Sequence, residues 1–163
     1  AQCVVELLIP DFGGSAEALK KVLDVRPEVL NHNIETVPRL FPKARGGGRY
    51  HVSLKLLQRA KKWAPKIVTK TGMMFGLGER DDEIRQVFED LVQRGVRILT
   101  LGQYLCPSSW HLPVRRYYHP DEFCYWREVA KEMGFDHVES GPLVRSSYLA
   151  DRQFASLNRS LKT

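Results

Sequence analysis

The 163-residue sequence is poor in two features that would each indicate a particular class of protein, long apolar runs and cysteines. It has no apolar run near the roughly 20 residues needed to cross a bilayer, so a membrane-spanning helix is excluded. Its three cysteines, Cys3, Cys106 and Cys124, are too few and too scattered for a disulfide scaffold or a closed metal site. We therefore expect a reducing compartment and buried free thiols.

The first residues show no signal or transit segment and no initiator Met, so we expect the natural N-terminus to lie upstream. A hydrophobic content of 43% with 27% charged residues fits one globular domain or part of a larger one.

Acidic residues are absent between Glu35 and Glu79, although the whole chain has 19 of them against 25 basic residues. This basic interval contains ten cations: Arg39, Lys43, Arg45, Arg49, Lys55, Arg59, Lys61, Lys62, Lys66 and Lys70. Such a run indicates either a solvated face or contact with an anionic partner. With only Phe41, Tyr50 and Trp63 interleaved among these cations, a stacking platform for nucleic acid is poorly supported.

Apolar runs alternate with helical periodicity along the chain. Strands are predicted at 4–9, 28–33, 66–75 and 97–105, and a loop rich in proline and glycine at 38–48. Helices are predicted after Ser15, around residues 54–64 and 81–95, and from Pro120 to Gly134. This order predicts an α/β fold with parallel strands and right-handed crossovers. A complete (β/α)8 barrel needs about 250 residues, so the chain could supply only about half of one.

Polar residues follow the predicted strands, where ligands gather in such folds. Asn31, Asn33 and Glu35 would share one face of a strand and suit the hydroxyls and amine of a small polar ligand. A hydrogen-bonded rim without a ligand is the alternative. His32 would point the other way and is interpreted as a core histidine.

A glycine-rich turn follows the third predicted strand, at residues 72–79 (GMMFGLGE). Bare backbone there could seat a planar ring or a phosphate, yet the third glycine of a dinucleotide fingerprint is replaced by Asp81. The serines of residues 145–148 (RSSY) leave a nucleophile, a phosphate site, a metal ligand and an ordinary turn all open.

Several segments together resemble lipoyl synthase, in order and at that family's spacing, over roughly residues 4–151. They are LIPDF (8–12), NHNIETV (31–37), TKTGMM (69–74), GLGE (76–79), LTLGQYL (99–105), HLPV (111–114) and SGPLVRSSY (140–148).

The resemblance implies a radical S-adenosylmethionine enzyme on a partial TIM-type barrel, of which this chain is the C-terminal half. Such enzymes insert two sulfur atoms, at C6 and C8, into an octanoyl chain on a lysine of a lipoyl carrier domain or of the glycine cleavage H protein. They use two 4Fe–4S clusters. One cleaves S-adenosylmethionine to a deoxyadenosyl radical, and the auxiliary one donates sulfur. Residues 1–151 would belong to the barrel domain and 152–163 would form a tail.

The family's site residues carry over onto matching positions of this sequence. Asn33 and Glu35 would hold the ribose and amino-acid part of S-adenosylmethionine, and Arg49 its carboxylate. Four residues of the glycine-rich segment match the adenine-side motif: Gly72, Met74, Gly76 and Glu79. Ser146 resembles the serine that ligates one iron of the auxiliary cluster, with Ser147 as the alternative.

The family's two cysteine triads are absent from this chain, and its own cysteines lack their spacing. We therefore expect this polypeptide alone to be inactive and assign it no catalytic residue. The location would be mitochondrial in a eukaryote and cytoplasmic in a bacterium, with neither a membrane nor a nucleic acid as partner.

Two alternatives remain. A biotin synthase-like enzyme is disfavoured because that family has aspartate at the position of Glu35 and lacks the Arg-Ser-Ser segment. A non-catalytic module could instead bind an acidic carrier protein through the basic interval.

Overall fold

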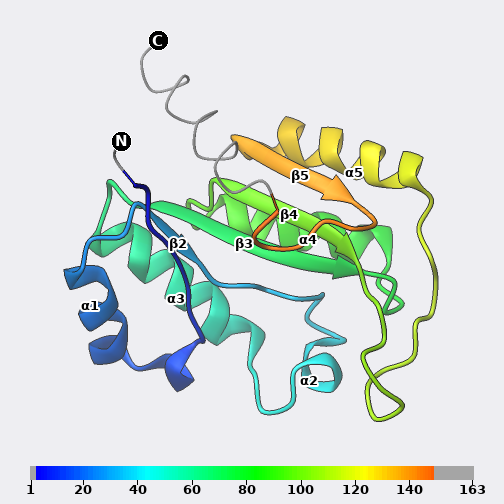
Figure 1. The fold of residues 1–163 in the computed structure, drawn as a ribbon, viewed down its shortest axis with the longest axis horizontal. Coiled ribbons are helices and arrows are strands. Elements are labelled where there is room, and N and C mark those ends of the chain that lie inside the picture. Colours follow the sequence, from blue (N-terminus) through cyan, green and yellow to red (C-terminus); the bar gives the residue numbers. More distant parts are fainter. Residues whose placement is uncertain (1–2, 149–163) are drawn as a thin grey trace.

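The computed structural model describes residues 3–148. Five strands, β1 (Glu6–Leu8), β2 (Val29–Asn31), β3 (Val68–Phe75), β4 (Ile98–Gln103) and β5 (His137–Gly141), alternate with helices (Figure 1). The helices are α1 (Ala16–Asp24), α2 (Phe41–Ala44), α3 (Tyr50–Trp63), α4 (Asp81–Val92) and α5 (Pro120–Met133), and a single 3-10 turn, η1, covers Phe12–Gly14. The predicted tail and the boundary at residue 151 lie outside the described residues.

All strand pairs are parallel, and the strands lie in chain order from β1 to β5 in one open sheet. Figure 1 shows them fanned out in that order, with α5 beside β5. The prediction of an α/β partial barrel with parallel strands is confirmed. Strand β5 was not among the predicted strands. Its segment is mostly polar, has a single buried valine and lacks the apolar run that marked the other strands.

Local sequence signals set most helix ends. The Ser15 hydroxyl accepts a hydrogen bond from the Ala18 amide at 3.3 Å and caps α1. Pro120 opens α5, and Gly134 ends it with a φ of 113°, a conformation that favours glycine. The short helix α2 lies inside the predicted loop, where Pro42 fits its first turn.

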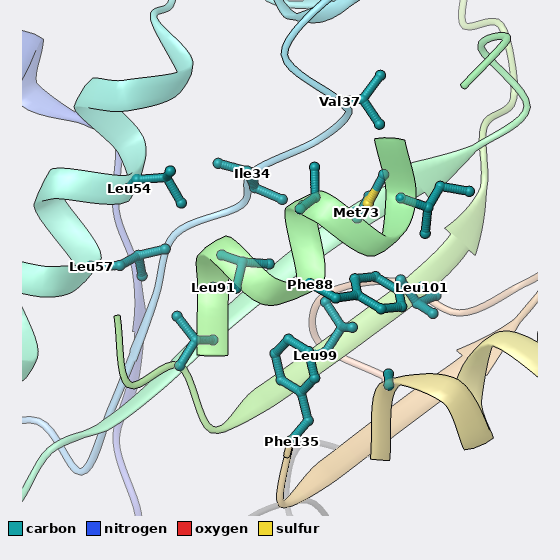
Figure 2. Packing of buried hydrophobic residues seen from close by; sticks show 14 of the residues in the cluster. Ile34, Val37, Leu54, Leu57, Met73, Phe88, Leu91, Leu99, Leu101 and Phe135 are labelled. Atoms are coloured by element: carbon teal, nitrogen blue, oxygen red, sulfur yellow. The ribbon is translucent and has the colours of Figure 1, made fainter. Parts of the chain in front are cut away.

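The two faces of the sheet differ in chemistry because side chains alternate along each strand. Met73, Phe75, Leu99 and Leu101 belong to the hydrophobic core, together with the inner sides of α3, α4 and α5. Figure 2 shows Phe88 and Leu91 of α4 among Leu99, Leu101 and Phe135. This face holds the helices on the sheet.

The opposite face carries small and polar residues. Lys70, Gly72 and Thr100 lie on this face, in positions where a helix-covered strand would carry large apolar residues. The Lys70 ammonium is fully buried and donates to the Glu6 carboxylate at 2.9 Å. That carboxylate also accepts from the Asn31 amide at 2.9 Å, so a polar cluster links β1, β2 and β3.

The basic interval does not form one continuous face, and this part of the prediction is wrong. Lys70 is buried, Arg39 pairs with Glu83 at 2.7 Å, and Lys61 donates to the Pro65 carbonyl at 2.8 Å. Lys61 and Lys62 lie at the C-terminal end of α3, which returns the chain to the start of β3. They are therefore at the edge opposite to the strands' carboxyl ends.

The prediction of buried thiols is also wrong, since Cys3, Cys106 and Cys124 are all free and exposed. Cys3 precedes β1, Cys106 lies in the loop after β4, and Cys124 is on the solvent side of α5. Over residues 3–148, no helix has the length and apolar character that a bilayer crossing requires.

Candidate functional site

The chain segment after β2 continues alongside β3 and positions two predicted site residues. The Glu35 amide donates to the Gly72 carbonyl at 3.0 Å, and the Met74 amide donates to the Glu35 carbonyl at 2.7 Å. Glu35 has a φ of 66°, a region that side chains other than glycine adopt at a cost of about 1–3 kcal/mol. The two backbone bonds hold this strained residue at the carboxyl edge of the sheet.

A pocket of about 790 Å³ opens at this edge, on the polar face of the sheet. Five residues predicted from the sequence as site residues line it together: Asn33, Glu35, Gly72, Met74 and Ser146. They come from three places in the chain, namely the segment after β2, strand β3 and the segment after β5. The structure therefore brings distant motifs of the sequence to a common cavity.

Three other predicted residues lie outside the lining of this pocket. Arg49 is exposed and occupies the N-cap position of α3. Gly76 and Glu79 shape the turn after β3, where the Glu79 carboxylate accepts from the amides of Gly76 at 2.6 Å and Leu77 at 2.9 Å. These bonds give Glu79 a structural role in the turn, whatever else it contacts.

Arg45 lines the pocket, and the sequence analysis did not single it out. Its guanidinium donates to the Asn33 carbonyl at 3.3 Å and lies 3.5 Å from the Ser53 hydroxyl. Its place directly before three glycines was the available signal, because the turn they form brings this side chain back toward β2. Arg45 lines the pocket with Glu35 and its charge acts on that carboxyl group, whereas Arg49 lies outside the lining.

The charge on Glu35 depends on opposing influences. Burial raises the pKa of its carboxyl group, while the Arg45 charge and a hydrogen bond from the Asn33 side chain lower it. The net effect is a raised pKa. The carboxylate therefore accepts a proton, or a hydrogen bond from a hydroxyl group, more readily than an exposed glutamate does.

His32 is a buried core residue, as predicted. Its Nδ1 lies 2.8 Å from the Ile9 carbonyl oxygen and its Nε2 lies 2.9 Å from the Ser53 hydroxyl. Burial lowers the pKa of the imidazole, which favours its neutral form. The expected grouping of Asn31 with Asn33 and Glu35 is wrong, because β2 ends at Asn31 and the Asn31 amide is buried against Glu6.

The two serines near the C-terminal end differ in position. Ser146 lines the pocket, whereas Ser147 is exposed and outside its lining. Gly102 allows this arrangement, because a Cβ there would lie 2.2 Å from the Val144 carbonyl oxygen. The segment before Ser146 thus packs directly on the bare backbone of β4.

The donor set of the pocket fits the polar parts of an adenosyl compound. Asn33 Oδ1 is buried and has no hydrogen-bond partner within the part of the chain that the structure describes. A Cβ at Gly72 would lie 2.8 Å from that oxygen and 3.0 Å from the Thr100 hydroxyl, so the glycine lets both polar side chains lie directly against the backbone of β3. Residues 3–148 contain no group of three or more His, Cys, Asp or Glu side chains placed to hold a metal.

Comparison with known proteins gives a consistent result. The chain is 56% identical over 161 residues to a lipoyl synthase of Koribacter versatilis, a match covering 99% of this chain and 53% of the relative. It is 53% identical over 157 residues to that of Rubrobacter xylanophilus, covering 96% of this chain and 49% of the relative. Against the Bacillus subtilis lipoyl synthase it is 52% identical over 149 residues, or 91% of this chain and 50% of the relative.

No protein-family model matches the chain. The chain spans about half the length of the curated relatives it matches. These matches confirm the resemblance found in the sequence, and the chain corresponds to the C-terminal part of lipoyl synthases.

Proposed function

We propose that the protein carrying this chain is a lipoyl synthase, a sulfurtransferase that inserts two sulfur atoms at C6 and C8 of an octanoyl group held on a carrier lysine. One observation carries the proposal. Asn33, Glu35, Gly72 and Ser146 belong to the motifs on which the resemblance rests, and they line one pocket at the carboxyl edge of the sheet. The identity of 52–56% to lipoyl synthases supports it.

S-adenosylmethionine is the proposed ligand of the pocket. The Glu35 carboxylate can accept from the ribose hydroxyls, and Asn33 Oδ1 offers an acceptor that no protein group uses. Gly72 and Met74, which line the pocket, would lie beside the adenine. Arg45 donates to the backbone carbonyl of Asn33, and its charge favours the ionised form of Glu35. Arg49 stays the residue that the resemblance suggests for the carboxylate of S-adenosylmethionine, although it lies outside the lining of the pocket.

Two 4Fe–4S clusters complete the proposed enzyme. When bound, one cluster would supply the electron that cleaves S-adenosylmethionine to a hydrogen-abstracting radical, and the other would supply the sulfur that replaces the hydrogen. This chain would contribute the Ser146 hydroxyl as an iron ligand, and the cysteine ligands would come from sequence outside these 163 residues. We accordingly predict that the 163-residue chain alone does not cleave S-adenosylmethionine.

The two alternatives have no specific observation in their favour. The relatives reported above are named lipoyl synthases, and Glu35 with residues 145–147 distinguishes this chain from biotin synthases. Those relatives are bacterial proteins, so we propose a bacterial cytoplasmic setting in place of a mitochondrial one.

The test uses the complete encoded protein, reconstituted anaerobically with iron and sulfide and given S-adenosylmethionine, a reductant and an octanoylated lipoyl carrier domain. Mass spectrometry of the carrier should show the gain of two sulfur atoms. Substitution Ser146→Ala should abolish sulfur insertion. A native enzyme that cleaves S-adenosylmethionine but leaves the carrier unmodified would overturn the proposal.

A further inference from the structure

One wall of the pocket is formed by the loop that follows β4. Leu105, Pro107, Trp110, His111 and Leu112 of this loop all line the cavity. Trp110 is 94% exposed although it is among the most apolar side chains of the chain. A large aromatic side chain left in water beside a pocket is typical of a protein contact site.

The exposure of Trp110 is built into the loop. The His111 amide donates to the Ser108 carbonyl at 3.1 Å, and the Ser108 hydroxyl lies 2.8 Å from His111 Nδ1. These bonds form a turn around Trp110 and leave its indole outside. The Tyr104 hydroxyl, which donates to the Leu112 carbonyl at 2.8 Å, fixes the base of the same loop.

Positive charge surrounds the entrance. Lys43, Arg45 and Arg145 line the pocket, and among residues 3–148 Glu35 is the only acidic residue in its lining. Lys43 and Arg145 are exposed, whereas the Arg45 guanidinium is directed toward Asn33 and Ser53. We call Lys43, Trp110 and Arg145 the rim of the pocket.

We propose that the rim is the docking surface for an acidic protein domain that delivers its acylated lysine into the pocket. That the partner carries an acylated lysine rests on the proposed function. That the partner is acidic rests on the charges of the rim itself. Lys43 and Arg145 complement carboxylates and speed encounter, while Trp110 supplies the apolar contact that such charges lack. Only one of the three rim residues is aromatic, whereas a single-stranded nucleic acid is bound through successive stacked bases, so the rim favours a protein.

The rim replaces the whole basic interval as the expected contact surface. Lys62 and Lys66 are also exposed, but they lie between α3 and β3, near the amino ends of the strands. They provide a matched control, because reversing two charges at either end lowers the net charge of the protein by the same amount.

The experiment measures binding of a purified octanoylated lipoyl carrier domain to the complete protein by isothermal titration calorimetry at low and physiological salt. Lys43→Glu with Arg145→Glu should weaken binding at least about tenfold and flatten its salt dependence. Lys62→Glu with Lys66→Glu should change the dissociation constant less than about twofold. Trp110→Ala should weaken binding about tenfold or more, while Tyr125→Ala, on the outer surface of α5, should not.

Equal effects of the two double substitutions, or none from Trp110→Ala, would overturn the docking proposal. Equally tight, rim-dependent binding of a single-stranded RNA would overturn its choice of partner. Sulfur insertion by the native protein is measured on the same preparation. Insertion with rim-independent binding refutes only the docking surface, whereas rim-dependent binding without insertion refutes only the proposed function.

Discussion

At the scale of single residues, glycine positions decide where the pocket can exist. Gly72 lets the side chains of Asn33 and Thr100 lie against its backbone, and Gly102 lets the carbonyl of Val144 approach the backbone of β4. Gly141, the register partner of Gly102 on β5, has only ordinary contact, since a Cβ there would lie 3.5 Å from a Val144 methyl group. A side chain at Gly102 would therefore disturb the structure, whereas one at Gly141 could be accommodated.

Gly102→Ala should displace the segment that carries Ser146, because the new methyl group cannot share space with a backbone oxygen. We expect a loss of about 1–3 kcal/mol in the free energy of unfolding. Hydrogen exchange at the Gln103 amide, which donates to the Pro142 carbonyl at 3.3 Å, should also accelerate. Gly141→Ala is the control and should alter both quantities much less, and equal effects of the two changes would contradict this account.

At the scale of elements, the turn between β3 and α4 depends on one carboxylate. Both Glu79 carboxylate oxygens accept hydrogen bonds from backbone amides. The following helix begins with Asp81, Asp82 and Glu83, whose negative charges suit the positive end of the helix dipole. The Glu83 carboxylate, paired with Arg39, has a pKa of about 2, lowered chiefly by that hydrogen bond. The turn after β3 and the start of α4 are therefore held by different carboxylates, those of Glu79 and Glu83.

Glu79→Gln should destabilise the protein by about 1–3 kcal/mol, because an amide has only one oxygen for the two backbone donors. Asp82→Asn, in the same first turn but exposed, should cost less than about 1 kcal/mol. Thermal or denaturant unfolding of the two variants checks the comparison. If Glu79→Gln leaves the stability unchanged, the structural role of Glu79 is wrong.

At the scale of the whole molecule, the fold was predictable because periodicity and glycine signals agree along most of the chain. The strands Val68–Phe75 and Ile98–Gln103 each contain several large apolar residues that pack under the helices, whereas His137–Gly141 is short and mostly polar and becomes a strand by pairing with β4. The positions of Arg45 and Arg49 could not be ranked from sequence, since the path of the intervening glycine turn decides which one faces the pocket.

The same limit explains the basic interval. Ten cations without an intervening acid suggested one face. Arg39, Lys61 and Lys70 instead make their contacts in three different parts of the fold. Charge runs along a chain that alternates strands and helices are divided between both edges of the sheet, so the surface they form depends on tertiary structure.

The central claim is that the pocket containing Asn33 and Glu35 binds S-adenosylmethionine, and its most direct test is the affinity of the complete, cluster-reconstituted protein for that compound. Equilibrium dialysis should show binding weakened about tenfold or more by Glu35→Gln or Asn33→Ala, since each removes a polar contact to the ligand. Glu89→Gln, an exposed change on α4, should leave the affinity unchanged. Native affinity in both pocket variants would contradict the account.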